Sequence, residues 1–190
     1  MVRPKPQPII RGEAHLVSAW FSNEWRLLDN GNEVARMRRF PRLHVSVVRL
    51  ADGTEWTIEP DGFAVVKAID SDGVEVGRIT RRSWWGRRWD ITGTGFAYEL
   101  TSHPIPRRWT IGIGGSPMTE IKGSLISYNT VTIDAPLSLA TVAGVLAWHV
   151  IARPWEAAAA PRGLVPRGRV PGGNAEDMGT VAAQVHVRHP

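Results

Sequence analysis

The sequence predicts one mainly β domain, a sandwich or a barrel of roughly a dozen antiparallel strands, with a single apolar helix near the C-terminus. Three observations lead to this fold class. Turn residues arrive every ten residues or so between Glu13 and Asp134, and the runs between them are rich in β-branched and aromatic residues. One long stretch, from Ala135 to Ala152, carries no charge.

Turns and strands follow one another in order along the first two thirds of the chain. A Gly that follows Asp or Asn supplies the positive φ that tight hairpin turns require. Such turns are predicted at 29–32, 52–53, 61–62 and 70–73. The strand candidates that these turns separate are residues 43–50, 54–58, 63–69, 74–80, 89–92, 96–101, 107–113 and 124–133. This spacing is typical of a meander of neighbouring strands.

The uncharged stretch predicts a helix over approximately residues 136–151. Asp134 can cap its start, Pro136 suits a first turn, and Arg153 and Pro154 end the run. Because apolar residues lie all round this helix, we expect it to be buried on every side, with His149 hydrogen-bonded to a strand backbone. A bilayer span needs about 20 apolar residues, which favours a protein interior over a membrane span at 137–151.

Composition limits the kinds of site and partner that this chain can have. The chain has 190 residues, 43% of them hydrophobic, and no Cys, which excludes disulfides, zinc–thiolate sites and cysteine nucleophiles. The net charge is +5, of which +2 belongs to residues 161–190, so the rest of the chain is only mildly basic at 5 − 2 = +3. This modest charge argues against nucleic acid as a partner. We expect residues 1–12 to be a disordered arm and the Pro/Gly/Arg-rich residues 161–190 a disordered tail.

The central segment from Asp70 to Ile91 resembles the recurring sequence of the tubby C-terminal-like superfamily, which includes the LURP-one-related proteins and the phospholipid scramblases. It contains a D-x-x-G turn, a strand that ends in basic residues, and a Trp that opens the next strand. Strand–turn–strand units flank it, and one apolar helix comes last. The resemblance implies a closed barrel of about twelve strands over 13–160, threaded by the helix. The phosphoinositide motif of tubby proteins and a palmitoylated cysteine-rich stretch are missing from the sequence, so the ligand stays open.

Two basic clusters are the candidate binding residues. The first mixes arginines with tryptophans, and the second is a run of arginines around Met37. Arg forks bind phosphate and Trp favours membrane interfaces, so we weigh an anionic lipid surface against tryptophans that pack inside and arginines that are merely solvated. Stacking of single-stranded bases is a third, weaker interpretation. The candidate lipid- or anion-binding residues are Arg78, Arg81, Arg82, Trp84, Trp85, Arg87, Arg88, Arg36, Arg38 and Arg39.

Other motifs point to turns rather than to chemistry. Asp70 and Asp72 begin a calcium-loop pattern, but its twelfth position is Arg81 instead of Glu. The glycine-rich segment 112–117 is neither a nucleophile elbow nor a phosphate loop. The sequence thus predicts no catalytic residue, no metal site and no cofactor.

We therefore expect a cytoplasmic, non-enzymatic binding protein that touches membranes peripherally through anionic phospholipids. An enzyme or small-ligand carrier that uses the barrel mouth is one alternative. A single-span membrane protein is the other. A deep pocket with paired carboxylates, or a Ser–His contact, would favour the enzyme.

Overall fold

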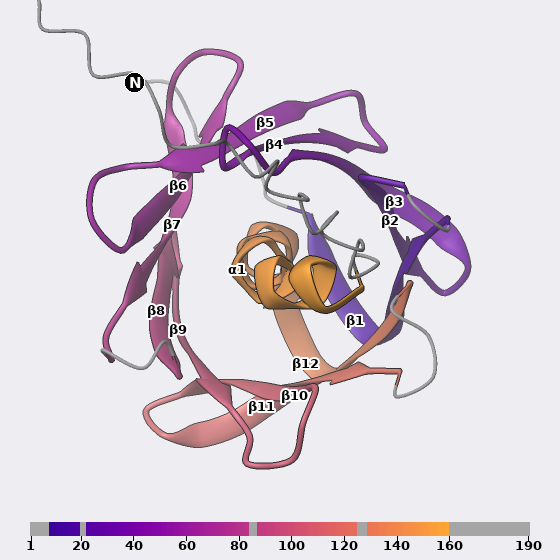
Figure 1. Ribbon diagram of the computed structural model, residues 1–190, viewed down its shortest axis with the longest axis vertical. Coiled ribbons are helices and arrows are strands. Elements are labelled where there is room, and N and C mark those ends of the chain that lie inside the picture. Colours follow the sequence, from indigo (N-terminus) through magenta and orange to yellow (C-terminus); the bar gives the residue numbers. More distant parts are fainter. Residues whose placement is uncertain (1–7, 20–21, 84–86, 125–128, 160–190) are drawn as a thin grey trace, which may run out of the picture. The chain divides into compact units, whose positions relative to one another are not determined.

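The computed structural model describes residues 8–19, 22–83, 87–124 and 129–159, with side chains described as far as residue 152. Within these residues, strands pair into one closed antiparallel barrel in which each strand neighbours the next in sequence and β1 pairs with β12 (Figure 1). The predicted closed barrel is confirmed. Its strands are β1 (Ile9–Ser18), β2 (Glu24–Asp29), β3 (Asn32–Phe40), β4 (Val45–Leu50), β5 (Glu55–Pro60), β6 (Val65–Asp70), β7 (Glu75–Arg81), β8 (Arg88–Gly93), β9 (Phe96–Ser102), β10 (Arg108–Ile113), β11 (Ser116–Gly123) and β12 (Thr130–Ala140).

Strand alternation produces the core. Along β4, Ser46, Val48 and Leu50 face inward and are buried, while the residues between them are not. The same period of two runs through the other strands, because successive side chains of a strand point to opposite faces. β1 begins at Ile9, so the barrel starts within the stretch that the sequence assigned to the arm. The predicted tail at 161–190 lies outside the described residues.

The up-and-down topology gives the barrel two distinct ends. Every second connection lies at the same end, because each strand runs antiparallel to the one before it. We call one the turn end. It holds the connections at 30–31, 51–54, 71–74, 94–95 and 114–115, and the junction between β12 and the helix. The other is the loop end, with the connections at 19–23, 41–44, 61–64, 82–87, 103–107 and 124–129.

The helix begins later than predicted. β12 continues to Ala140, and α1 runs from Thr141 to Ala159, past Pro154. The predicted start at residue 136 was wrong because β12 pairs with β1 on both sides of this position, through Asp134 and Ala135 before it and Leu139 and Ala140 after it. Between Ala135 and Leu139 the register shifts, so Pro136 lies in a bulge, where its missing N–H leaves no gap in the ladder.

Helix α1 lies inside the ring of strands, as expected (Figure 1). Of its described side chains, all from Thr141 to Ala152 are buried except Val150, which is partly buried. Trp148 packs edge-on against Trp25 of β2, with ring centroids 4.6 Å apart. Gly144 lets the helix approach the wall closely, since a Cβ there would lie 3.2 Å from the Ile10 side chain. In the described part of the chain, no helix has both the length and the apolar character needed to cross a membrane.

Candidate functional site

The first predicted cluster divides between the barrel wall and the loop end. Arg78 lies midway along β7 and bonds the Glu75 carboxylate at 2.6 Å and Asp61 at 3.3 Å. These contacts raise the pKa of Arg78, through the Glu75 hydrogen bond above all, and the same hydrogen bond lowers the pKa of Glu75. Arg82 is paired with Asp90 and Glu99. Arg78 and Arg82 are therefore already engaged by carboxylates of the chain.

The second cluster divides in a similar way. Arg36, in the middle of β3, is held by Glu24 and Glu33, and the Glu33 hydrogen bond raises the pKa of Arg36. Arg38 is exposed near the loop end, with its guanidinium 5.4 Å from the centroid of the Phe40 ring. Arg39 is only 3% exposed and points into the barrel, because it shares the inward face with Ala35 and Met37. Burial removes Arg39 from any headgroup-binding surface.

The remaining arginines gather at the loop end. Arg87 and Arg88 are exposed, and the Ser83 hydroxyl accepts hydrogen bonds from both of their backbone N–H groups. Arg42, the last arginine of the second basic run, is exposed in the β3–β4 loop. Among the residues that the structure describes, no carboxylate lies within ion-pair distance of these three arginines. The predicted Trp84 and Trp85 lie outside the described residues.

Charge separates the two ends. The described loop-end connections hold Arg42, Arg82, Arg87 and Arg107 against Asp61, a balance of 4 − 1 = +3. Asp61 is itself engaged by Lys67 at 3.3 Å and by Arg78. The turn-end connections hold only Asp52 and Asp72, a balance of −2. The connections of the barrel thus differ in net charge, positive at the loop end and negative at the turn end.

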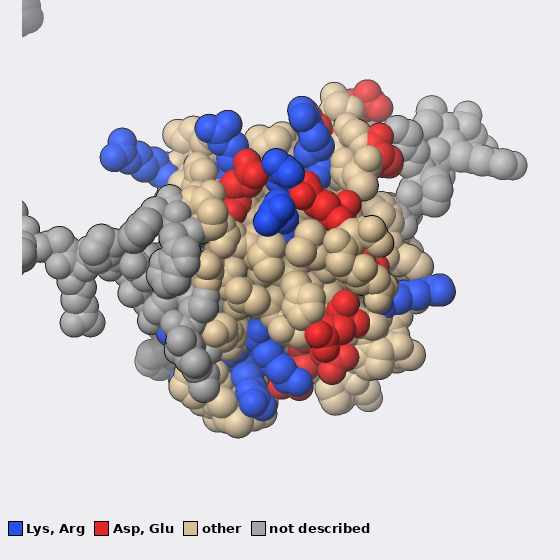
Figure 2. Space-filling model, turned by 90° about the vertical axis from the view of Figure 1, so that its right-hand side faces the viewer, with Lys and Arg blue, Asp and Glu red and all other residues tan. Residues whose placement is uncertain are grey.

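The wall between the ends is more nearly neutral. Figure 2 shows the side of the barrel that carries β2 and β3, where basic and acidic side chains lie beside one another. Strands β2 to β5 contain ion pairs of Arg36 with Glu24 and Glu33, and of Arg49 with Glu55. The two basic clusters therefore form no shared face on the wall. Their members without a carboxylate partner in the described structure lie toward the loop end, on different sides of the barrel, because β3 and β8 are not neighbours in the ring.

One Ser–His contact is present, but it lies in the core. Ser46 Oγ is 2.9 Å from His149 Nδ1, and the two residues are 0% and 1% exposed. His149 thus bonds the side-chain hydroxyl of a strand residue. Arg39 is buried directly across the β3–β4 ladder from Ser46. Burial of both residues denies a substrate access to this contact.

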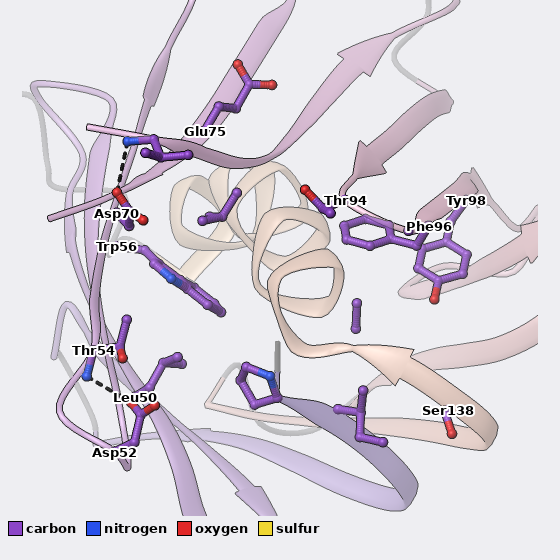
Figure 3. A pocket seen from close by; sticks show the side chains of 16 residues that line it. Leu50, Asp52, Thr54, Trp56, Asp70, Glu75, Thr94, Phe96, Tyr98 and Ser138 are labelled. Carbon is purple, nitrogen blue, oxygen red and sulfur yellow. Dashed lines mark hydrogen bonds between the residues drawn. The ribbon is translucent and has the colours of Figure 1, made fainter. Parts of the chain in front are cut away.

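A pocket of about 510 Å³ opens at the turn end, beside the start of α1. Trp56 lies on one side of the helix and Phe96 with Tyr98 on the other, while the Glu75 carboxylate points away (Figure 3). Asp52 Oδ1 accepts from the Thr54 N–H, and Asp70 Oδ1 accepts from Asp72 and Val74, so both carboxylates fix their own turns. Among the described residues, no group of three His, Cys, Asp or Glu could hold a metal ion.

Three exposed apolar residues of the loop end escaped the sequence interpretation. Leu43 is 69% exposed, Phe63 is 84% exposed and Ile105 is 45% exposed. Their shared end could have been predicted from the sequence. In an antiparallel meander every second connection lies at the same end, and this places the connections 41–44, 61–64 and 103–107 together. Clustered charge along the sequence carries no information about which loops share an end.

The comparisons with known proteins support the fold and nothing finer. No family model and no curated protein matches the chain. The X-ray structure of an Arabidopsis thaliana protein, AT5G01750, a LURP-one-related protein, is similar with a TM-score of 0.50. The alignment has 12% identity and covers 73% of this chain and 90% of the Arabidopsis chain. At this identity the similarity establishes a shared barrel architecture only.

Proposed function

We propose that this protein is a non-enzymatic binding protein that docks on anionic phospholipid surfaces through the loop end. The observation that carries the proposal is the set of exposed loop-end arginines without carboxylate partners in the described structure, chiefly Arg42, Arg87 and Arg88. A guanidinium whose donors are not used by the chain can bind a phosphate oxygen pair. The opposite charge of the turn end orients the barrel on a negative surface.

The strength of such docking can be bounded. A Lys or Arg near an anionic leaflet contributes about 1 kcal/mol, so three arginines contribute about 3 kcal/mol, or roughly a hundredfold in partitioning. The attraction is Coulombic and falls off within a Debye length, about 10 Å at 0.1 M salt and about 3 Å at 1 M. Binding should therefore be peripheral, selective for anionic lipid and sensitive to salt. The cytoplasmic leaflet, which carries the anionic lipids, is the proposed location.

Liposome co-sedimentation tests the proposal. The full chain is expected to pellet with vesicles of phosphatidylcholine and phosphatidylserine, not with phosphatidylcholine alone, and to be released as salt rises. The triple variant Arg42→Gln, Arg87→Gln, Arg88→Gln should lose roughly a hundredfold in partitioning. A control triple at Arg11, Arg36 and Arg49 removes the same charge away from the loop end and should bind nearly as well as the parent. Equal losses in both triples would reduce the effect to net charge and reject the site.

The turn-end pocket supports a second candidate function, a carrier of a small apolar ligand. Its lining combines Trp56, Phe96 and Tyr98 with aliphatic side chains at the barrel mouth, and concave apolar sites with a few polar groups are typical of ligand binding. A neutral apolar dye is expected to bind the parent and to be blocked by Thr94→Trp, which fills the pocket. Dye binding that Thr94→Trp leaves unchanged would reject this candidate.

A further inference from the structure

We propose that Leu43, Phe63 and Ile105 form an insertion rim, three apolar side chains that enter the outer part of the bilayer when the loop-end arginines bind headgroups. The inference rests on the proposed function and adds a hydrophobic contribution to it. The three residues belong to the β3–β4, β5–β6 and β9–β10 loops, so they lie at three places around the loop end. Contacts spread around the rim would set the barrel axis along the membrane normal.

The exposure of the insertion rim is large for a monomeric soluble surface. Phe63 is 84% exposed and Leu43 is 69% exposed, the two highest values among the exposed large hydrophobic residues of the described structure. Single exposed apolar residues are common, but apolar residues that recur in several loops of one end mark an interaction surface. The arginines of the same end indicate that the partner of this surface is anionic.

Backbone strain accompanies each member of the rim. His44 follows Leu43 with φ 57°, Ala64 follows Phe63 with φ 61°, and Arg107 lies two residues after Ile105 with φ 61°. At the turn end, every residue with positive φ is a glycine or Asn30, to which this region comes easily. Strained non-glycine residues tend to be kept where a site needs a particular loop shape. Here they fix the loops that present the three apolar side chains.

Phe63 also contacts a cation in a way that suits a membrane interface. The Arg81 guanidinium lies 5.3 Å from the centroid of the Phe63 ring. One face of the ring is thereby covered by charge, while most of the side chain stays exposed. In a bilayer the ring would lie at the edge of the acyl region, and the guanidinium would stay at the level of the phosphates.

The turn end also exposes apolar residues, and it is the competing surface. Val74 is 58% exposed and Ile113 is 51% exposed. Val74 lines the turn-end pocket, and the neighbouring connections carry Asp52 and Asp72 without a basic residue. An anionic membrane repels that end and attracts the other. Charge thus selects the loop end even though both ends expose apolar side chains.

A matched pair of isoleucines provides the test. Ile105 and Ile113 are 45% and 51% exposed and lie at opposite ends. Because the natural chain has no Cys, Ile105→Cys and Ile113→Cys each accept a single environment-sensitive NBD label. With phosphatidylserine-containing vesicles, the label at 105 should brighten and shift to the blue, and the label at 113 should not change. The double variant Leu43→Ser, Phe63→Ser should lose at least tenfold in partitioning, while Val74→Ser, Ile113→Ser should bind like the parent.

The outcomes separate this inference from the function on which it rests. If the parent pellets with anionic vesicles and the label at 105 stays in water, insertion is wrong and headgroup capture stands. Equal shifts at 105 and 113 would also reject the insertion rim, because the label would then report contact without orientation. If neither the parent nor any variant pellets, both the proposed function and the insertion rim fail. Thermal unfolding of each variant checks that the barrel is intact.

Discussion

The turn end and the loop end are made by the same twelve-stranded meander, yet they differ in nearly every chemical respect. The turn end has connections of two to four residues, uses glycine or Asn30 wherever φ is positive, and carries only acidic charge. The loop end has connections of four to six residues, non-glycine residues at positive φ, and exposed arginines, Arg42, Arg87 and Arg88, without a carboxylate partner in the described part of the chain. Both ends expose apolar side chains. Short hairpins without backbone strain suffice to close a barrel. The strained, longer connections of the loop end are therefore the ones that need a functional explanation.

The largest loss of stability is expected from a substitution in helix α1, which fills the barrel between the two ends. Trp148 is fully buried and packs against Trp25. Trp148→Ala should lower the free energy of unfolding by about 3–5 kcal/mol, because it opens a cavity that the barrel cannot collapse around. Urea unfolding followed by circular dichroism measures it. As a control, Leu43→Ala, at an exposed loop position, should change the free energy of unfolding by less than about 0.5 kcal/mol. If Trp148→Ala also changed it by so little, the interior around the helix would not be tightly packed.

At the turn end, close strand approach limits substitution more than backbone conformation does. A Cβ on Gly112 would lie 2.4 Å from the Ser116 carbonyl oxygen, across the bulge between β10 and β11. Gly112→Ala should therefore cost about 1–3 kcal/mol by overpacking. Gly115→Ala, where φ is +82° and no atom is near, should cost about 1 kcal/mol from backbone strain alone. Chemical denaturation of the two variants compares these costs, and a harmless Gly112→Ala would show that the bulge is not tight.

At the loop end, introducing a glycine should stabilise the protein at a position where φ is positive. Ala64 has φ 61°, a conformation that glycine adopts without a Cβ clash. Ala64→Gly should raise the free energy of unfolding by up to about 1 kcal/mol. The control Ala97→Gly, at an exposed position of β9, should lower it by about 0.5–1 kcal/mol through lost backbone entropy. Matching losses at both positions would mean that Ala64 is not strained.

The smallest effect belongs to the wall between the ends. The Arg78 hydrogen bond lowers the pKa of Glu75 below its ordinary value of 4.5. Its contribution to stability is therefore complete above that value and is lost as the pH falls through the lowered pKa. Since Arg78 and Glu75 are 38% and 37% exposed, Glu75→Gln should cost only about 0.5 kcal/mol near neutral pH. The difference in thermal unfolding between parent and variant should shrink as the pH falls below 4.5 through the lowered pKa. A difference that grows as the pH falls would contradict a stabilising ion pair.

Much of the barrel could be predicted because its signals are local. Asp-Gly turns at 52–53, 61–62 and 72–73 mark strand boundaries through the φ that each turn requires. The uncharged stretch that ends at Ala152 could not face water, so a surrounding sheet or a membrane had to cover it. Alternation along β3 also held a signal that the sequence interpretation missed, since Arg39 shares its face with Ala35 and Met37.

The candidate site was less accessible because it depends on partners from other strands. Nothing near Arg78 in the sequence says that Asp61 will reach it, and nothing near Pro136 says that β1 will hold residues 134–140 in a strand. Which arginines are neutralised, and which remain for a ligand, follows from strand neighbours that are many residues away.

Short-range chemistry of the chain was enough to specify a β meander with one helix that must be hidden from water, since turn φ values and the pattern of apolar residues act over a few residues. Pairing between distant strands decided where that helix begins, which arginines keep their charge unpaired, and that those arginines share one end with Leu43, Phe63 and Ile105. Charge neutralisation and the gathering of loops are set by distances in space, and only the closed barrel defines those distances.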